Sequence, residues 1–157
     1  MLKIKIIVVD RTRSSFLQDG ESFYLKRIRR YAPVDWIEVK PASIKKGRKP
    51  KALLTEEEKS IAHCLKNQDY LVAVDRRGSE VDSQGLASWM ENWSISIAGH
   101  LTFLIGGPLG LSDNILERAH RRFSLSKLTL THEMSRLVLL EQIYRALTIM
   151  RGEPYHK

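Results

Sequence analysis

The chain has 157 residues, 43% of them hydrophobic and 28% charged, which is the composition of a globular domain and excludes a disordered or fibrous polypeptide. Its 26 lysines and arginines against 18 acidic residues give a formal net charge of +8, an excess that favours a polyanionic partner, nucleic acid above all. We expect one domain over residues 1–157. An internal disulfide bond is excluded, because Cys64 is the only cysteine.

The N-terminal stretch MLKIKIIVVD has no apolar region followed by the small-residue cleavage site of a signal peptide. No run reaches the roughly 18 apolar residues that a membrane span needs. A lone cysteine also suits a reducing compartment. We therefore expect a cytoplasmic protein that makes no contact with a membrane.

The first half of the chain alternates strand and helix patterns. Residues 2–9 are predicted to form a buried strand, 14–31 an amphipathic helix and 34–39 a second strand. Residues 40–51 hold six basic residues, so we expect an exposed loop there. Its charge density suits RNA phosphates, although a solvated charge run has the same composition. The capping-box sequence TEEE predicts a helix that begins at Thr55 and ends near residue 67.

The same alternation continues to the end of the chain. The expected elements are a strand at 70–75, a helix from Ser83, a strand at 101–105, a helix from Ser112 or Asp113 to about 122, a strand at 123–130 and a helix at 133–150. Such a sequence predicts an α/β fold with a mainly parallel sheet and helices on both faces. Ligands of such sheets bind beyond the carboxyl ends of the strands.

The strand at 101–105 runs into a glycine-rich turn, within the stretch FLIGGPLGLS at 103–112. Glycine permits positive φ and a close approach of backbone to another backbone or to a ligand. A tight turn and a pocket lined by backbone amides are both compatible with this stretch. The turn matches neither the dinucleotide fingerprint nor the phosphate loop. The histidines and the cysteine lack metal-ligand spacing, so we expect no metal, and no serine lies in a nucleophile elbow.

Several sequence segments occur in the order and at the spacing that one known protein family shows. The stretches LIGGPLGLS, SLSKLTLTHEMSRLVLLEQIYRA and PYHK, with KIKIIVVD, FYLKRIRRY and VAVDRRG before them, resemble the bacterial 23S rRNA pseudouridine N3-methyltransferase family. This family is the small, single-domain branch of the SPOUT methyltransferases. The resemblance implies a C-terminal deep trefoil knot that holds S-adenosylmethionine, a homodimer, and methylation of rRNA in the assembled ribosome.

The resemblance also implies a cofactor site. It comprises Val74, Gly106, Gly107 and a stretch that binds through its backbone: Ser126, Lys127, Leu128, Thr129, Leu130 and Thr131. Thr131 stands where the family usually has proline, and threonine there restores an N–H group and could cap the last helix. The residues after the first strand, Asp10 to Arg13, also depart from the family, which usually has a glycine there.

The catalytic and substrate-binding residues follow from the same resemblance. His132 or His156 is expected to accept the proton of N3, since imidazole titrates near neutral pH. Arg136, Tyr155, His156 and Lys157 are expected to bind the RNA. The structural alternatives are a packing role for His132 and an ion pair between Arg136 and Glu133. Glu141 and Arg145, four residues apart, are expected to form an ordinary helix-surface pair.

Two other functions remain open on the sequence alone. A basic RNA- or ribosome-binding module without catalytic activity has the same charge, and Thr131 is the one feature that favours it. A different nucleotide-dependent α/β enzyme would bind a phosphate-bearing ligand, but the chain has no phosphate motif. The motifs favour the methyltransferase.

Overall fold

Five strands form one parallel sheet in the order β2–β1–β4–β3–β5 in the computed structural model, which describes residues 1–156. The strands are β1 (Ile4–Val9), β2 (Val34–Val39), β3 (Tyr70–Ser79), β4 (Leu101–Ile105) and β5 (Arg121–Phe123). The helices are α1 (Ser15–Ile28), α2 (Pro50–Ala62), α3 (Ser83–Ser96), α4 (Asp113–Arg118) and α5 (His132–Met150).

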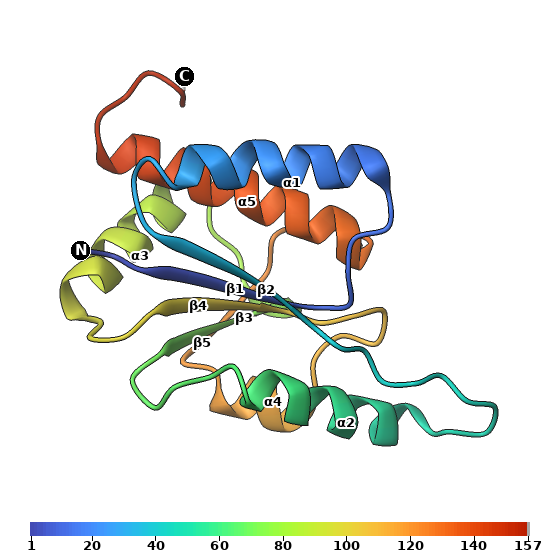
Figure 1. Ribbon diagram of the computed structural model, residues 1–157. Helices are drawn as coiled ribbons and strands as arrows, with labels where there is room; N and C mark the ends of the chain where they lie inside the picture. The colour runs from blue at the N-terminus through green and yellow to red at the C-terminus, as the bar shows by residue number, and fades with distance from the viewer. Residues whose placement is uncertain (157) are drawn as a thin grey trace.

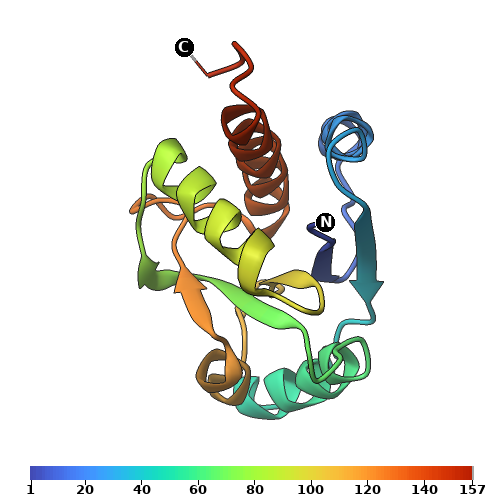
Figure 2. The same ribbon diagram turned by 90° about the vertical axis from the view of Figure 1, so that its left-hand side faces the viewer.

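Helices cover both faces of the sheet, as the sequence predicts. Helices α1, α3 and α5 lie on one face, and α2 and α4 lie on the other (Figures 1 and 2). Alternate side chains of β1 supply the two cores: Ile6 and Val8 pack in the larger cluster with α1, α3 and α5, and Ile7 and Val9 in the smaller cluster. Because both faces of β1 are buried, its sequence is apolar throughout rather than alternating. No helix of residues 1–156 has the length and hydropathy that crossing a bilayer requires.

The bounds of several predicted elements differ in the structure: β3, for example, continues to Ser79 instead of ending at residue 75, and α4 ends at Arg118 instead of near residue 122. Helix α2 begins at Pro50, which occupies its first turn, and not at Thr55. Thr55 lies inside the helix, where its hydroxyl donates to the carbonyl of Lys51 at 2.9 Å. The predicted strand at 123–130 is wrong beyond Phe123: Ser124 makes one hydrogen bond to the end of β3, residues 125–131 pair with no strand, and Leu128 is 77% exposed.

The connections place a ligand-binding edge at the carboxyl ends of β3 and β4. These strands are neighbours, yet the helix that follows β3 lies on one face of the sheet and the helix that follows β4 lies on the other. The chain therefore leaves the two strands in opposite directions and opens a crevice between them. Such a switch point is where open α/β sheets bind their ligands.

A buried ion pair fixes the opposite, amino-terminal edge of the sheet. The Lys5 Nζ atom lies 2.7 Å from the Asp69 Oδ2 atom, and both side chains are buried. Asp69 also accepts hydrogen bonds from the backbone N–H groups of Lys66 and His100. Burial opposes ionisation of Asp69, but these hydrogen bonds and the charge of Lys5 outweigh it and lower the pKa of the carboxyl group. The pair thereby ties β1 to the starts of β3 and β4.

Substitution of Lys5 by methionine tests this tie. K5M leaves the Asp69 carboxylate buried without its countercharge, so we expect a loss of about 3–5 kcal/mol in the free energy of unfolding. K3M is the matched control, because Lys3 is exposed on the same segment and its loss should change stability by less than about 0.5 kcal/mol. Urea unfolding of both variants measures the difference, and equal stabilities would contradict the role of the pair.

Candidate functional site

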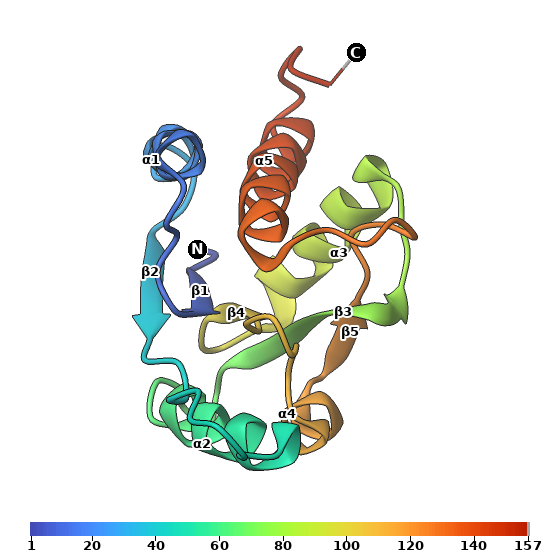
Figure 3. The same ribbon diagram turned by 90° about the vertical axis from the view of Figure 1, so that its right-hand side faces the viewer.

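A cleft of about 980 Å³ lies at the carboxyl ends of β3 and β4, which is the size of a small-molecule site. Figure 3 shows the segments around it from this side. Its walls are the ends of the two strands, the glycine-rich turn, the irregular chain after β5 and the start of α5. The lining residues are Val74–Arg77, Ile105–Leu111, Ser124–Ser126, Leu128–Glu133 and Ser135.

The glycine-rich turn closes on itself through its backbone. The Gly110 N–H group donates to the Gly107 carbonyl at 2.9 Å, and Gly110 has a φ of +78°. A Cβ atom on Gly106 would lie 2.2 Å from the Gly110 carbonyl oxygen, so no side chain fits there. On Gly107 the nearest atom would be in the Val9 side chain at 3.5 Å, an ordinary contact. The stretch is therefore both a tight turn and a wall of the cleft, and Gly106 is the glycine that the turn requires.

The irregular segment 124–131 offers backbone donors to the cleft. Its first residue is held to β3, where the Ser124 N–H group donates to the Ser79 carbonyl at 3.0 Å. The N–H groups of Thr129, Leu130 and Thr131 make no hydrogen bond within residues 1–156. Thr129 and Thr131 are exposed and Leu130 is half-buried, so these three donors are open to solvent or to a polar ligand in the cleft.

Thr131 explains how the chain tolerates a departure from proline. Its φ of −62° is the value to which proline is fixed, so both residues fit the same backbone. Its hydroxyl accepts the N–H group of Met134 at 3.2 Å and caps α5, a contact typically worth about 1 kcal/mol. Threonine therefore preserves this wall of the cleft and adds a helix cap.

The other residues expected to bind the cofactor mostly reach the cleft. Val74, Gly106, Gly107, Ser126, Leu128 and Leu130 all line it. Lys127 does not line it and is exposed to solvent. The structure thus gathers eight of the nine residues, with Thr129 and Thr131, around one space.

His132 lies at the start of α5 and also lines the cleft. Burial lowers the pKa of its imidazole, and the positive charge of Arg136 lowers it further, while Glu133 and Asp10 oppose the shift. The imidazole is therefore neutral at neutral pH and can accept a proton from a bound substrate.

Arg136 does not have the role that the sequence predicts. Its side chain is completely buried, its Nη1 atom donates to the Thr12 hydroxyl at 2.9 Å, and its Nη2 atom donates to the Val9 carbonyl at 2.6 Å. The guanidinium group cannot reach an RNA phosphate from this position, so that prediction is wrong. The alternative, a pair with a carboxylate such as Glu133, is not formed as a direct contact: the Glu21 carboxylate is joined to Arg136 through the Thr12 hydroxyl, and the Glu133 carboxylate accepts the backbone N–H group of Arg13.

The C-terminal tail folds back along α5, away from the cleft (Figure 1). The Tyr155 hydroxyl donates to Glu141 at 3.1 Å, and the Arg145 guanidinium lies 4.6 Å from the centre of the Tyr155 ring. The predicted pair of Arg145 with Glu141 is present at 2.5 Å, and Arg145 also lies 3.4 Å from the His156 Nδ1 atom. Sequence reasoning missed this clustering around Arg145. Lys157 lies outside the described residues.

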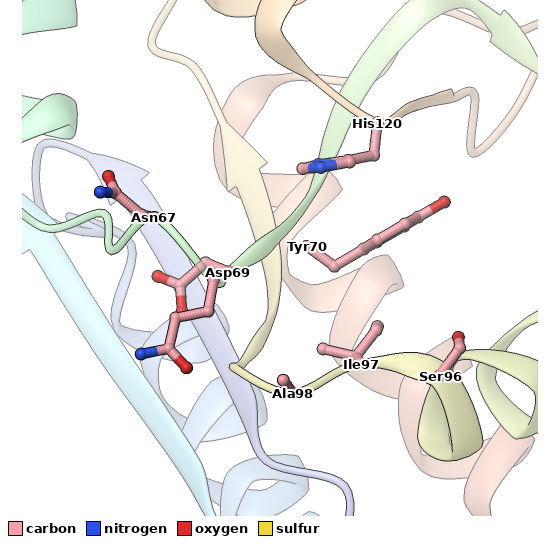
Figure 4. A pocket seen from close by; sticks show the side chains of 8 residues that line it. Asn67, Asp69, Tyr70, Ser96, Ile97, Ala98 and His120 are labelled. Carbon is pink, nitrogen blue, oxygen red and sulfur yellow. The ribbon is translucent and has the colours of Figure 1, made fainter.

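A second, smaller cavity of about 310 Å³ lies at the amino-terminal edge of the sheet (Figure 4). Two of the polar groups that line it already have partners: Asp69 binds Lys5, and the His120 Nδ1 atom accepts the Leu71 N–H group at 3.0 Å. The His120 ring also stacks on Tyr70, with centroids 4.6 Å apart. The cleft at the carboxyl ends, with its free backbone donors, is therefore the candidate site.

Known proteins with similar sequences support the same conclusion. A family model described as "Predicted SPOUT methyltransferase" matches residues 2–156. A protein of Desulfotalea psychrophila named ribosomal RNA large subunit methyltransferase H is 42% identical over 158 residues, which cover 99% of this chain and 100% of that one. A protein of the same name from Cytophaga hutchinsonii is 38% identical over 156 residues and 99% of both chains.

Solved structures share the fold at low sequence identity. A probable methyltransferase from Bordetella pertussis superposes with a TM-score of 0.60 at 14% identity, over 93% of this chain and 95% of that one. A probable methylase family protein from Haemophilus influenzae gives a TM-score of 0.54 at 15% identity, over 97% of this chain and 68% of that one. With the family model matching almost every residue, the chain belongs to the SPOUT methyltransferase family.

Proposed function

We propose that this chain is a single-domain enzyme that transfers a methyl group from S-adenosylmethionine to N3 of a pseudouridine in 23S rRNA of the assembled ribosome, in the cytoplasm. The observation that carries the proposal is the cleft, where free backbone donors and the Gly106 turn lie together in a member of this family. The names of the relatives supply the substrate class. The net charge of +8 suits an RNA partner.

The cofactor fits the cleft through the backbone. The free N–H groups of Thr129, Leu130 and Thr131 match the polar edges of an adenosine, and Gly107 lines the same cleft. When bound, S-adenosylmethionine supplies a methyl group on a sulfonium, whose departure as a neutral thioether needs no metal. The residues of the cleft contribute by holding N3 in line with that methyl group, which is the main source of rate in such transfers.

The proton on N3 needs an acceptor. His132 lies in the cleft and is neutral at neutral pH, so we propose it as the base, directly or through a water molecule. His156 is the second candidate, because the tail is expected to shape the target site.

The position of the tail supports a homodimer. Arg145, against which Tyr155 and His156 pack, lies 13 positions after His132 (145 − 132) on α5, so the tail is about 20 Å from the cleft of its own chain. A tail that binds the target nucleotide therefore serves the cleft of a second copy. Sedimentation equilibrium is expected to give twice the mass of the chain, and a monomer in the presence of cofactor would contradict this arrangement.

The knot is also part of the proposal. The hydrogen bond between Ser124 and Ser79 brings the segment after β5 against the end of β3, close to the connection that leads to α3. A knot requires the chain to thread at this contact. An experimental structure traced through residues 74–135 tests the threading.

Methylation of ribosomes tests the proposed function. Ribosomes from a strain that lacks the corresponding methyltransferase are incubated with the protein and S-adenosylmethionine, and their rRNA nucleosides are analysed by mass spectrometry. We expect one N3-methylpseudouridine per large subunit, and none without protein. If the protein binds ribosomes and adds no methyl group, the non-catalytic RNA-binding module is the correct function.

The pH dependence of this reaction tests His132. Because burial holds the pKa of His132 below its usual value of 6.5, we expect a constant rate from about pH 7 upward and a loss of activity below pH 6.5, as the imidazole takes up a proton. H132N should lower kcat by about a hundredfold and abolish the acid limb. H63N is the matched control, since His63 is exposed at the end of α2. An acid limb that persists in H132N and is lost in H156N would transfer the role to His156.

A further inference from the structure

The connection between β1 and α1 has an unusual conformation beside the cleft. Asp10 has a φ of +71°, a left-handed conformation that few residues other than glycine adopt. Its Oδ1 atom accepts the N–H group of Arg11 at 2.8 Å. After this sharp turn Thr12 is buried, and Arg11 and Arg13 on either side of it are exposed.

Buried groups hold this loop in place. The Thr12 hydroxyl accepts a hydrogen bond from the Arg136 guanidinium at 2.9 Å and donates to Glu21 at 2.5 Å. The Arg136 guanidinium also binds the Val9 carbonyl, so a buried cation anchors both ends of the turn to α5. The backbone of the loop is thus fixed, and the two exposed arginine side chains project from a rigid support.

The loop adjoins the cleft. The Arg13 N–H group donates to the carboxylate of Glu133, which lines the cleft. Arg76 and Arg77 lie at the cleft wall formed by the end of β3. Exposed arginines therefore occur in two places next to the cofactor site, after β1 and after β3.

The carboxylates near the cleft pair with some of these arginines and leave others without a countercharge. Asp10 pairs with Arg13 at 2.9 Å, and Asp75 pairs with Arg77 at 3.4 Å. The side chain of Arg11 makes no ion pair or hydrogen bond to any residue from 1 to 156. The side chain of Arg13 is 63% exposed, so its guanidinium retains donors for a second partner.

We propose that Arg11 and Arg13 bind a phosphate group of the RNA strand next to the target nucleotide. This proposal rests on the proposed function and names the surface through which the RNA is held. A guanidinium group matches a phosphate in charge and in geometry, with two parallel N–H donors. The buried Arg136 acts through this loop as a positioning residue: it holds the two exposed arginines beside the cleft and does not touch the RNA.

The double variant R11A/R13A tests the proposal in the ribosome methylation assay. Loss of two charge-assisted contacts should raise KM for ribosomes by at least about tenfold, while kcat and the affinity for S-adenosylmethionine stay unchanged. The dependence of log KM on log salt concentration should become shallower by about 1 to 2. R11K/R13K keeps the charge and should restore the salt dependence, with a smaller recovery of KM.

R29A/R30A is the matched control, because these arginines are equally exposed but lie at the far end of α1. It should leave KM and its salt dependence as in the wild type. The melting temperature of every variant shows whether the fold is intact.

Two results would overturn the proposal. One is an R11A/R13A variant with the KM and salt dependence of the wild type. The other is a variant whose kcat, cofactor affinity or melting temperature falls, because the loop would then be structural. Failure of the proposed function gives a different pattern: the wild type adds no methyl group. In that case, salt-dependent binding of ribosomes measured by co-sedimentation still tests the two arginines, with a shallower dependence in R11A/R13A supporting them.

Discussion

The site depends on one close approach of backbone to backbone, between Gly106 and Gly110. Because Gly106 has no Cβ atom, the backbone of Gly110 can pack directly against it, and the chain folds back on itself directly after β4. The chain therefore does not extend past the carboxyl end of β4. The turn and the irregular segment 124–131 line the same cleft. A space lined in this way presents peptide groups to a ligand, and the side chain of Thr131 caps α5.

A buried cation organises the other side of the cleft. Arg136 lies on α5 and binds a carbonyl at the end of β1 and a hydroxyl in the next loop, with the Glu21 carboxylate joined through that hydroxyl. Burial lowers the pKa of Arg136, but the nearby carboxylates, Glu21 foremost, oppose the shift. If one member of such a network is removed, the other buried groups lose their hydrogen-bond partners. The network therefore holds the loop after β1 and the start of α5 together.

The sequence predicts the type and order of the helices and of the first four strands, because each follows from its local hydrophobic period, but β5 overlaps the predicted strand only at Phe123. The predicted bounds of an element are wrong where a pattern typical of one structure occurs in a segment that has another structure. The capping-box sequence at Thr55 lies inside α2, which begins five residues earlier at Pro50. The alternating residues after Phe123 suit a strand, yet the segment lines a cleft and exposes Leu128.

The site was predictable only in part, for a physical reason. Most of the residues expected to bind the cofactor could be located from the sequence, because they lie in contiguous motifs that resemble those of a known family. The burial of Arg136 could not be, since its partners Val9 and Thr12 are 127 and 124 residues away in the chain. Neither the hydrophobic period nor the residue spacing around Arg136 indicates these two partners. The conformation of the loop after β1 could not be predicted for the same reason, because Arg136 on the last helix holds it in place.

The central claim is that the Gly106 turn and the segment 124–131 form a site for S-adenosylmethionine. Calorimetric titration of the wild type, G106A and G107A with this cofactor, and with ATP as a control ligand, tests it most directly. The account predicts micromolar binding of S-adenosylmethionine but not ATP to the wild type. G106A is expected to lose that binding because a Cβ atom clashes with the Gly110 backbone, and the melting temperature of G107A is expected to equal that of the wild type, because its Cβ atom makes only an ordinary contact. A wild type that does not bind the cofactor, or a G106A variant that binds it equally well, would contradict the account.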